Sequence, residues 1–166
     1  MTTYTNQQWL LDKRPSGMPT DDCWKLNEKE VPELKEGELL IKVLYLSIDP
    51  YMRGRINDGE SYAAPAAIGE PMTGESVGVV VESKSDKFIK GDYLCTHQGC
   101  QSYIIANEED PQLFKADPSI VPLSTYLCTV GMPGRTGYFV LLRGGLPTSA
   151  NTIVVCAAYG SDGTEG

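Results

Sequence analysis

The sequence has little that could build a metal site or a hydrolytic centre, because it contains a single histidine, His97. Cys95, His97 and Cys100 lie close together, but no second pair of ligands completes the four that a structural zinc ion takes. With one histidine, a hydrolytic triad also lacks support. The sequence therefore predicts no bound metal, and His97 is interpreted as a strand-end residue beside incidental thiols.

Long apolar runs and basic clusters are missing too. No stretch approaches the roughly 18 apolar residues of a membrane span, and the N-terminus has neither the basic start nor the apolar run of a signal peptide. The 14 basic residues face 22 acidic ones, the net charge is −8, and no stripe of Lys and Arg is suited to phosphates. These absences predict a cytoplasmic protein with neither a membrane nor a nucleic acid as partner.

The cysteine count and the length limit the domain organisation. The five cysteines are odd in number and scattered, which in a reducing compartment indicates buried or free thiols rather than a disulfide framework. A chain of 166 residues with 41% hydrophobic content can bury the core of one modest globular domain. A second full domain is not expected.

Short apolar runs separated by turn signals dominate the first two thirds of the sequence, a pattern typical of a small antiparallel β domain. The expected strands are residues 38–48, 74–83, 93–96 and 101–106. Gly78, inside the second of these runs, indicates a bulge or a close approach of the backbone. The sequence therefore predicts a mainly β fold, a barrel with an irregular flank.

The pattern changes after Pro118, where helical spacing replaces the short apolar runs. Ser124 could cap a helix over residues 122–128, and a second helical segment runs from Thr136 to Leu142. We therefore expect a β domain over residues 1–122. Residues 123–166 are expected to form a helical connector and the start of a further domain.

The last residues resemble the first turn of a dinucleotide-binding fold. An apolar run from Ile153 to Cys156 leads into a glycine-rich turn from Ala157 to Gly163. In such turns the glycines let the backbone approach a pyrophosphate, and a helix follows whose N-terminal amides hold the anion. Gly160 and Gly163 are therefore candidate cofactor-binding residues. Three residues follow the turn, too few for that helix.

Five motifs occur in a fixed order, and together they are far more specific than any one alone. They are Arg14–Gly17, Tyr45–Arg55, Ser61–Tyr62, Val80–Ser83 and Val130–Gly134. In order and separation they resemble the zinc-independent, NADPH-dependent branch of the medium-chain dehydrogenases/reductases. That branch includes curcumin reductase, the prostaglandin reductases and the plant double-bond reductases. The resemblance covers nearly the whole chain to about residue 142 and then weakens.

The resemblance implies a GroES-like catalytic domain followed by a Rossmann domain, of which this chain would hold only a truncated start. It also implies hydride transfer from NADPH to the β-carbon of an α,β-unsaturated ketone or aldehyde. Zinc-dependent members of the wider superfamily carry a cysteine after the first long strand and Gly-His-Glu in the next. Here those places read Ser47-Ile48-Asp49 and Thr73-Gly74-Glu75, so the resemblance implies no zinc.

Carried over from the family, Tyr51 is the candidate catalytic residue, because a phenol can donate a hydrogen bond to a carbonyl oxygen and stay protonated at neutral pH. Tyr62 and Met132 are expected to contact the substrate, and Thr136 is expected to face the nicotinamide. Plainer interpretations stay open. Tyr51 can be a boundary tyrosine with a packed ring, Tyr62 a surface residue of a loop, and the segment around Met132 simply a helix break.

The implied cofactor domain is mostly missing, and Asp162 stands where a small apolar residue is usual. An anion beside a pyrophosphate is unfavourable. We therefore expect NADP(H) in the full-length family but not on this chain, which should fold without reducing an enone. The alternative is a non-enzymatic module that self-associates or binds a partner through the surface normally covered by the missing domain. An exposed apolar patch from Tyr126 to Leu142 would favour that alternative.

Overall fold

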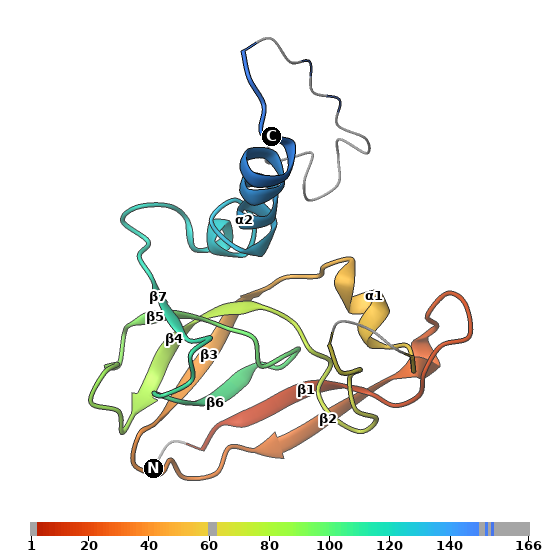
Figure 1. Cartoon of the computed structure of the whole chain (residues 1–166). Coiled ribbons are helices and arrows are strands. Elements are labelled where there is room, and N and C mark those ends of the chain that lie inside the picture. Colours follow the sequence, from red (N-terminus) through yellow and green to blue (C-terminus); the bar gives the residue numbers. More distant parts are fainter. Residues whose placement is uncertain (1–2, 60–62, 150–151, 153, 155–166) are drawn as a thin grey trace. The chain divides into compact units, whose positions relative to one another are not determined.

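The computed structural model of the chain describes residues 3–59, 63–149, 152 and 154. The chain divides into two compact units, Met1–Ala116 and Asp117–Gly166, and each is described by itself (Figure 1). The boundary between residues 122 and 123 stays a prediction. The predicted glycine-rich turn from Ala157 to Gly163 lies outside the described residues, as does most of the apolar run before it.

The first unit is built on an antiparallel five-stranded sheet with the strand order β6-β3-β4-β5-β7. Its strands are β3 (Glu38–Leu46), β4 (Ser76–Ser83), β5 (Tyr93–Thr96), β6 (Tyr103–Asn107) and β7 (Phe114–Ala116). Four of them are the predicted strands, with ends that differ by no more than two residues. The sequence missed β7, because three residues are too few to show a period. The predicted mainly β fold is confirmed.

The larger apolar cluster packs on this sheet. Leu39 and Ile41 of β3 meet Val80 of β4, Leu94 of β5 and Ile104 of β6, and all five side chains are almost fully buried. Leu40 lies between Leu39 and Ile41 and is equally buried, so both faces of β3 are covered at this end. A strand covered on both faces reads as a continuous apolar run, which explains why this segment gave the strongest strand signal.

Gly78 confirms the predicted close approach of two backbones. A β-carbon at Gly78 would lie 2.3 Å from the carbonyl oxygen of Lys42 and 2.6 Å from Cγ2 of Ile41. The pairing of β3 with β4 shifts register between Val43 and Tyr45, beside the place where Val43 pairs with Gly78. Glycine is therefore required here by the bulge in the neighbouring strand rather than by its own dihedral angles.

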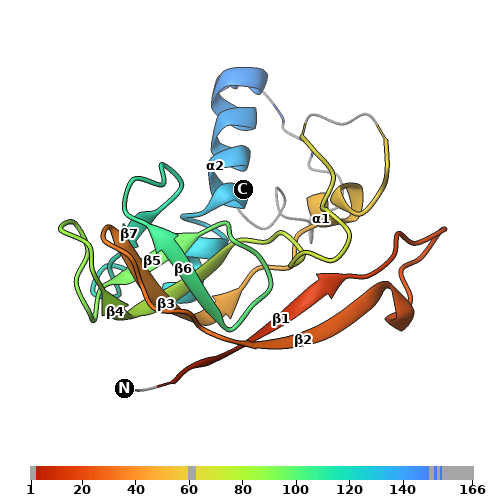
Figure 2. The ribbon, with the colours of Figure 1, turned by 90° about the horizontal axis from the view of Figure 1, so that it is seen from below.

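A long hairpin of β1 (Thr5–Leu11) and β2 (Trp24–Glu30) lies beside the sheet, and sequence reasoning missed it (Figure 2). A loop that includes the 3₁₀ turn Asp21–Cys23 joins the two strands. The signal was hidden because two of the three buried side chains of β1, Asn6 and Gln8, are amides, and only Leu11 is apolar. Gln8 donates to the side-chain oxygen of Gln101 at 2.7 Å and accepts from Asn27 at 3.1 Å. Buried amides satisfied in this way stabilise a strand that shows no hydrophobic alternation.

The short helix α1 (Tyr51–Arg55) follows β3 and covers a second apolar cluster. Pro50 precedes it with a φ of −56°, the value that a proline ring imposes and that a helix start needs. The buried members of this cluster are Leu11, Met52, Ile56, Ala66, Met72 and Cys100. The cluster therefore joins the hairpin, α1 and the segments that lead into β4 and β6.

The second unit contains the 3₁₀ turn η2 (Leu123–Leu127), α2 (Met132–Phe139) and the π-helical turn η3 (Val140–Gly145). Both predicted helical segments are present, and the second begins four residues earlier than expected, at Met132. The predicted cap is wrong, because Ser124 lies inside η2 and Pro122 stands at its N-cap. The hydroxyl of Tyr126 accepts from the backbone N–H of Asp117 at 2.9 Å, which anchors η2 within this unit. In the part of the chain that the structure describes, no helix has the length and apolar character needed to cross a membrane.

A carboxylate ties the turn after β4 to the segment after β6. Glu108 accepts hydrogen bonds from the Ser85 hydroxyl, from Asp86 N at 2.8 Å and from Lys87 N at 3.4 Å. The bond from Ser85, together with the backbone N–H donors, lowers the pKa of Glu108 below its ordinary value. These bonds hold the carboxylate charged.

The lowered pKa of Glu108 gives this contact a definite pH dependence. A carboxyl whose folded-state pKa is depressed stabilises the fold above its unfolded pKa, about 4.3 for glutamate, and loses that contribution as the pH falls through the folded pKa. In Glu108→Gln, we expect the stability deficit relative to the unmodified chain to shrink from neutral pH to about pH 3. Urea midpoints at a series of pH values measure this. A deficit that stays constant with pH would contradict the assignment.

Candidate functional site

The predicted catalytic residue Tyr51 lies at the start of α1, where the chain leaves β3 and turns. The turn is closed by backbone bonds, from Met52 N to Asp49 O at 3.0 Å and from Arg53 N to Pro50 O at 3.1 Å. Tyr51 is partly buried, and its ring packs against the apolar cluster beneath α1. A packed ring fits both the boundary interpretation and a pocket role, so its catalytic role stays a prediction.

An apolar cleft of about 850 Å³ opens beside α1. Its floor is the buried cluster that α1 covers, and its walls come from the hairpin and from the segment between β3 and α1. The lining residues are Trp9, Pro19, Asp21, Trp24, Leu46, Ile48, Asp49, Met52, Arg53, Ile56, Met72 and Cys100. Tyr51 is not among them, whereas its neighbours Met52 and Arg53 are. Sequence reasoning missed this cleft, because its lining comes from five separate segments of the chain.

The two predicted residues of the second unit lie one turn apart on α2. The hydroxyl of Thr136 donates to the carbonyl oxygen of Met132 at 2.8 Å and lies 3.6 Å from its sulfur. This i to i−4 bond uses the hydroxyl proton and leaves the oxygen as an acceptor. The structure therefore brings Met132 and Thr136 together, and their contacts with substrate or nicotinamide stay predictions. Tyr62, Gly160 and Gly163 lie outside the described residues.

The two places where zinc-dependent relatives would carry metal ligands meet at one end of the sheet. Ser47 N donates to the carbonyl oxygen of Glu75 at 2.9 Å. The buried carboxylate of Glu75 is 2.7 Å from His97 Nε2 and belongs to a cross-strand pair that continues the register of β4 and β5. Among the described residues, no group of three or more His, Cys, Asp or Glu side chains could hold a metal ion. A paired acid and imidazole thus occupy this end of the sheet.

The run from Gly74 to Gly78 also spells the Gly-x-Ser-x-Gly pattern of a hydrolase nucleophile. The structure excludes that function. Ser76 lies in β4 opposite Thr96 of β5, and its side chain is 0% exposed. A nucleophile of this kind needs a sharp turn between a strand and a helix that exposes its hydroxyl.

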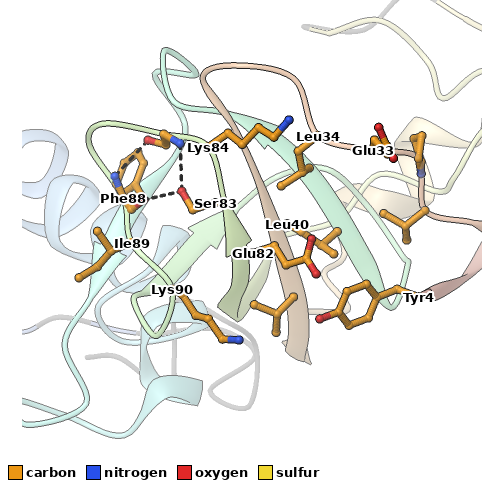
Figure 3. A pocket seen from close by; sticks show the side chains of 14 residues that line it. Tyr4, Glu33, Leu34, Leu40, Glu82, Ser83, Lys84, Phe88, Ile89 and Lys90 are labelled. Atoms are coloured by element: carbon orange, nitrogen blue, oxygen red, sulfur yellow. Dashed lines mark hydrogen bonds between the residues drawn. The ribbon is translucent and has the colours of Figure 1, made fainter. Parts of the chain in front are cut away.

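A second groove, of about 680 Å³, lies over the β4–β5 turn and the segment after β2 (Figure 3). Its lining mixes apolar side chains with charges of both signs, among them Glu33, Glu82, Lys84 and Lys90. Partial burial, with the Glu82 carboxylate nearby, raises the pKa of Tyr4. No predicted site residue lines this groove, and its titratable groups form no catalytic arrangement.

The fold and the α1 segment place the chain in a known class of protein. Residues 7–114 match the family described as the N-terminal domain of oxidoreductase, and the chain belongs to that family. Within it, the chain is an N-terminal portion from the branch of medium-chain dehydrogenases/reductases that contains the curcumin, prostaglandin and alkenal reductases, and its first unit has the GroES-like fold. The resemblance predicted from the five motifs is confirmed.

Three relatives show the extent of the match. The NADPH-dependent curcumin reductase of Escherichia coli is 40% identical over 95% of this chain and 45% of its own length. Prostaglandin reductase 1 of Bos taurus is 39% identical over 95% of this chain and 46% of its own length. The crystal structure of CurA from Vibrio vulnificus superposes with a TM-score of 0.88 at 38% identity, covering 96% of this chain and 47% of that one. The chain thus spans about half the length of the relatives it matches.

Proposed function

We propose that this chain is the substrate-binding catalytic portion of an NADP-dependent oxidoreductase that reduces the C=C bond of α,β-unsaturated ketones and aldehydes. One observation carries the proposal. Nearly the whole chain aligns at 40% identity with an NADPH-dependent curcumin reductase, while it spans 45% of that enzyme. The substrate would be a small molecule, and a cytoplasmic location stays a prediction.

In this proposal the chain positions the substrate. NADP(H), when bound, supplies the hydride. Tyr51 would donate its phenolic proton in a hydrogen bond to the carbonyl oxygen of the enone, where negative charge develops as the β-carbon is reduced. Met132 and Tyr62 would contact the substrate. Thr136 would face the nicotinamide carboxamide. Its hydroxyl donates a hydrogen bond to Met132 O, and its oxygen can still accept one from an amide N–H. Gly160 and Gly163 would approach the pyrophosphate.

The isolated chain is proposed to be inactive, because it spans only 45% of the NADPH-dependent curcumin reductase that it matches. The test is a fusion of residues 1–142 to the portion of the Escherichia coli curcumin reductase that follows the matched position. We expect the fusion to oxidise NADPH in the presence of an enone and to yield the saturated ketone, whereas the chain alone gives neither. A folded fusion that binds NADPH but leaves the enone unreduced would refute the function. Activity of the chain alone would refute its inactivity.

The fusion also tests Tyr51. In Tyr51→Phe the ring can keep its packing, so a purely structural tyrosine predicts a kcat within about twofold of the parent. Loss of a hydrogen bond to the developing oxyanion predicts a kcat roughly 100-fold lower. Arg55→Lys, a change on the same helix at a side chain that does not line the apolar cleft, controls for disturbance of α1.

The alternative function, a module that self-associates or binds a partner, is favoured by one observation. Val130, Tyr138, Phe139, Val140, Leu141 and Leu142 are each more than a third exposed. Tyr126 and Leu127, at the start of the predicted patch, are buried instead. An exposed apolar surface of this kind is typical of an interface. Light scattering on the pure chain distinguishes the two functions, because a strict monomer at all concentrations would argue against the module.

A further inference from the structure

The cleft beside α1 has the size and composition of a small-molecule site. Its volume of about 850 Å³ falls in the range of roughly 300–1,000 Å³ that ligand pockets occupy. Two indoles, two methionines and the aliphatic side chains Leu46, Ile48 and Ile56 make most of the lining. Trp9 is 51% exposed and Ile48 is 76% exposed, so both offer apolar surface that a ligand could cover. Burial of this surface would favour an apolar ligand.

The cleft is formed within the first unit alone and is held by hydrogen bonds. The backbone of Trp9 donates to the carbonyl oxygen of Cys100 at 2.9 Å and accepts from the N–H of Met72 at 2.8 Å. These bonds fix one indole-bearing residue to two residues of the floor. On the other side, Arg53 donates to the carbonyl oxygen of Gly17 at 2.6 Å, which holds the loop before Pro19 against α1. A site held in this way needs little ordering when a ligand binds.

The charges at the cleft select the kind of ligand. Asp21 and Asp49 contribute two carboxylates to the lining. The guanidinium of Arg53 donates to Gly17 O and to Asn57 Oδ1, and within the described residues it forms no ion pair with either aspartate. The chain as a whole carries a net charge of −8. With two carboxylates and one guanidinium, the lining carries a net negative charge, so it would repel an anionic ligand and not a neutral one.

We propose that this cleft binds the planar, conjugated or aromatic end of a neutral small molecule, and that this chain binds it without a cofactor domain. Indole faces favour stacking with a flat ring, and methionine sulfur favours its edge. The proposal rests on the proposed function in one respect, since it takes the neutral enone as the natural ligand. It adds the place where the ring of that ligand lies, and that place can be tested without turnover.

The chain carries its own reporter for this test. Trp9 and Trp24 are its two tryptophans, and both line the cleft. Titration of the full chain with 4-phenyl-3-buten-2-one should quench the tryptophan emission in a saturable way, with a Kd below about 1 mM. Cinnamate has the same ring and double bond but a carboxylate in place of the ketone. It should bind at least about tenfold more weakly, because it brings an anion to a lining whose two carboxylates outnumber its one guanidinium.

A matched pair of variants localises the binding. Ile48→Glu places a charge at the rim of the cleft, on a side chain that is already 76% exposed, so the chain should stay folded. It should raise the Kd for the ketone by about tenfold or more. Ile120→Glu makes the same change at a side chain that is 72% exposed and does not line the cleft, and should leave the Kd unchanged. Equal effects of the two variants, or equal affinity for ketone and cinnamate, would overturn the proposal.

Three further outcomes distinguish this proposal from self-association and from the proposed function. If tryptophan emission shifts with protein concentration while light scattering shows a doubled mass, a second copy occupies the cleft and the proposal fails. If the ketone binds to the chain but the active fusion described above shows no reduction, the cleft stands and the proposed function fails. If the fusion is active while the chain and its Ile48→Glu variant show no ketone binding, the function stands and the cleft assignment fails.

Discussion

Gly99→Ala is expected to lower the free energy of unfolding of the first unit by about 2–5 kcal/mol. Gly99 has a φ of +89°, in the left-handed region that costs a residue with a β-carbon roughly 1–2 kcal/mol. A β-carbon there would also lie 2.6 Å from the carbonyl oxygen of Met72. That oxygen cannot move freely, because it accepts the N–H of Cys100 at 2.8 Å. The backbone contact should add about 1–3 kcal/mol.

A second glycine separates the two contributions. Gly91 has a φ of +98°, but a β-carbon there would meet nothing within 4 Å. Gly91→Ala should therefore show only the dihedral cost, about 1–2 kcal/mol. Urea unfolding of the two variants gives the contact energy as their difference. Equal losses would mean that the carbonyl of Met72 yields without cost, and that the floor of the cleft is less rigid than its hydrogen bonds indicate.

His97→Leu is expected to cost about 2–3 kcal/mol near neutral pH. Glu75 is 7% exposed, and His97 Nε2 lies 2.7 Å from its Oε1. Removing the imidazole leaves a buried carboxylate without its partner, a change that typically costs about 3–5 kcal/mol when both groups are fully buried. The His97 side chain is 30% exposed, so water can reach part of the space it leaves and the cost falls below that range.

A double-mutant cycle separates the pair from its surroundings. Glu75→Gln keeps a polar side chain for His97 and should cost about 1 kcal/mol. The double variant should then cost less than the sum of the single changes, because no unpaired charge is left buried. Lys87→Leu is the control, since it breaks the exposed pair with Glu109 and should change stability by less than about 0.5 kcal/mol. Strict additivity at Glu75 and His97 would show that the two groups do not interact.

The strands that the sequence predicted are those whose stability comes from apolar burial. The runs in β3 and β4 showed their period or continuity directly, because their side chains fill the core on one or both faces. The sequence pattern did not predict the β1–β2 hairpin, because Asn6 and Gln8 are buried polar residues whose partners, such as Gln101, lie more than 90 residues away. No local pattern reports a hydrogen bond over that separation.

The candidate site was predicted unevenly for a similar reason. Tyr51 was found because it lies inside a contiguous motif, and the structure places it on α1 as a partly buried residue. The apolar cleft beside it was not found, since Trp9, Ile48 and Met72 come together only when the hairpin and α1 pack on the same cluster. His97 was interpreted as a strand-end residue, and its pairing with Glu75 follows from the alignment of β4 and β5.

By itself, the sequence determined the mainly β class, four strands of the sheet, the helical character of residues 122–128 and 136–142, and the family, because each depends on local patterns or ordered motifs. Tertiary structure alone decided which distant residues meet. It set the register that pairs Glu75 with His97, the buried amides that hold the hairpin, and the cleft that gathers both tryptophans. These features depend on contacts between segments far apart in the chain. Such contacts produce no periodic pattern in the local sequence, so the sequence alone does not predict them.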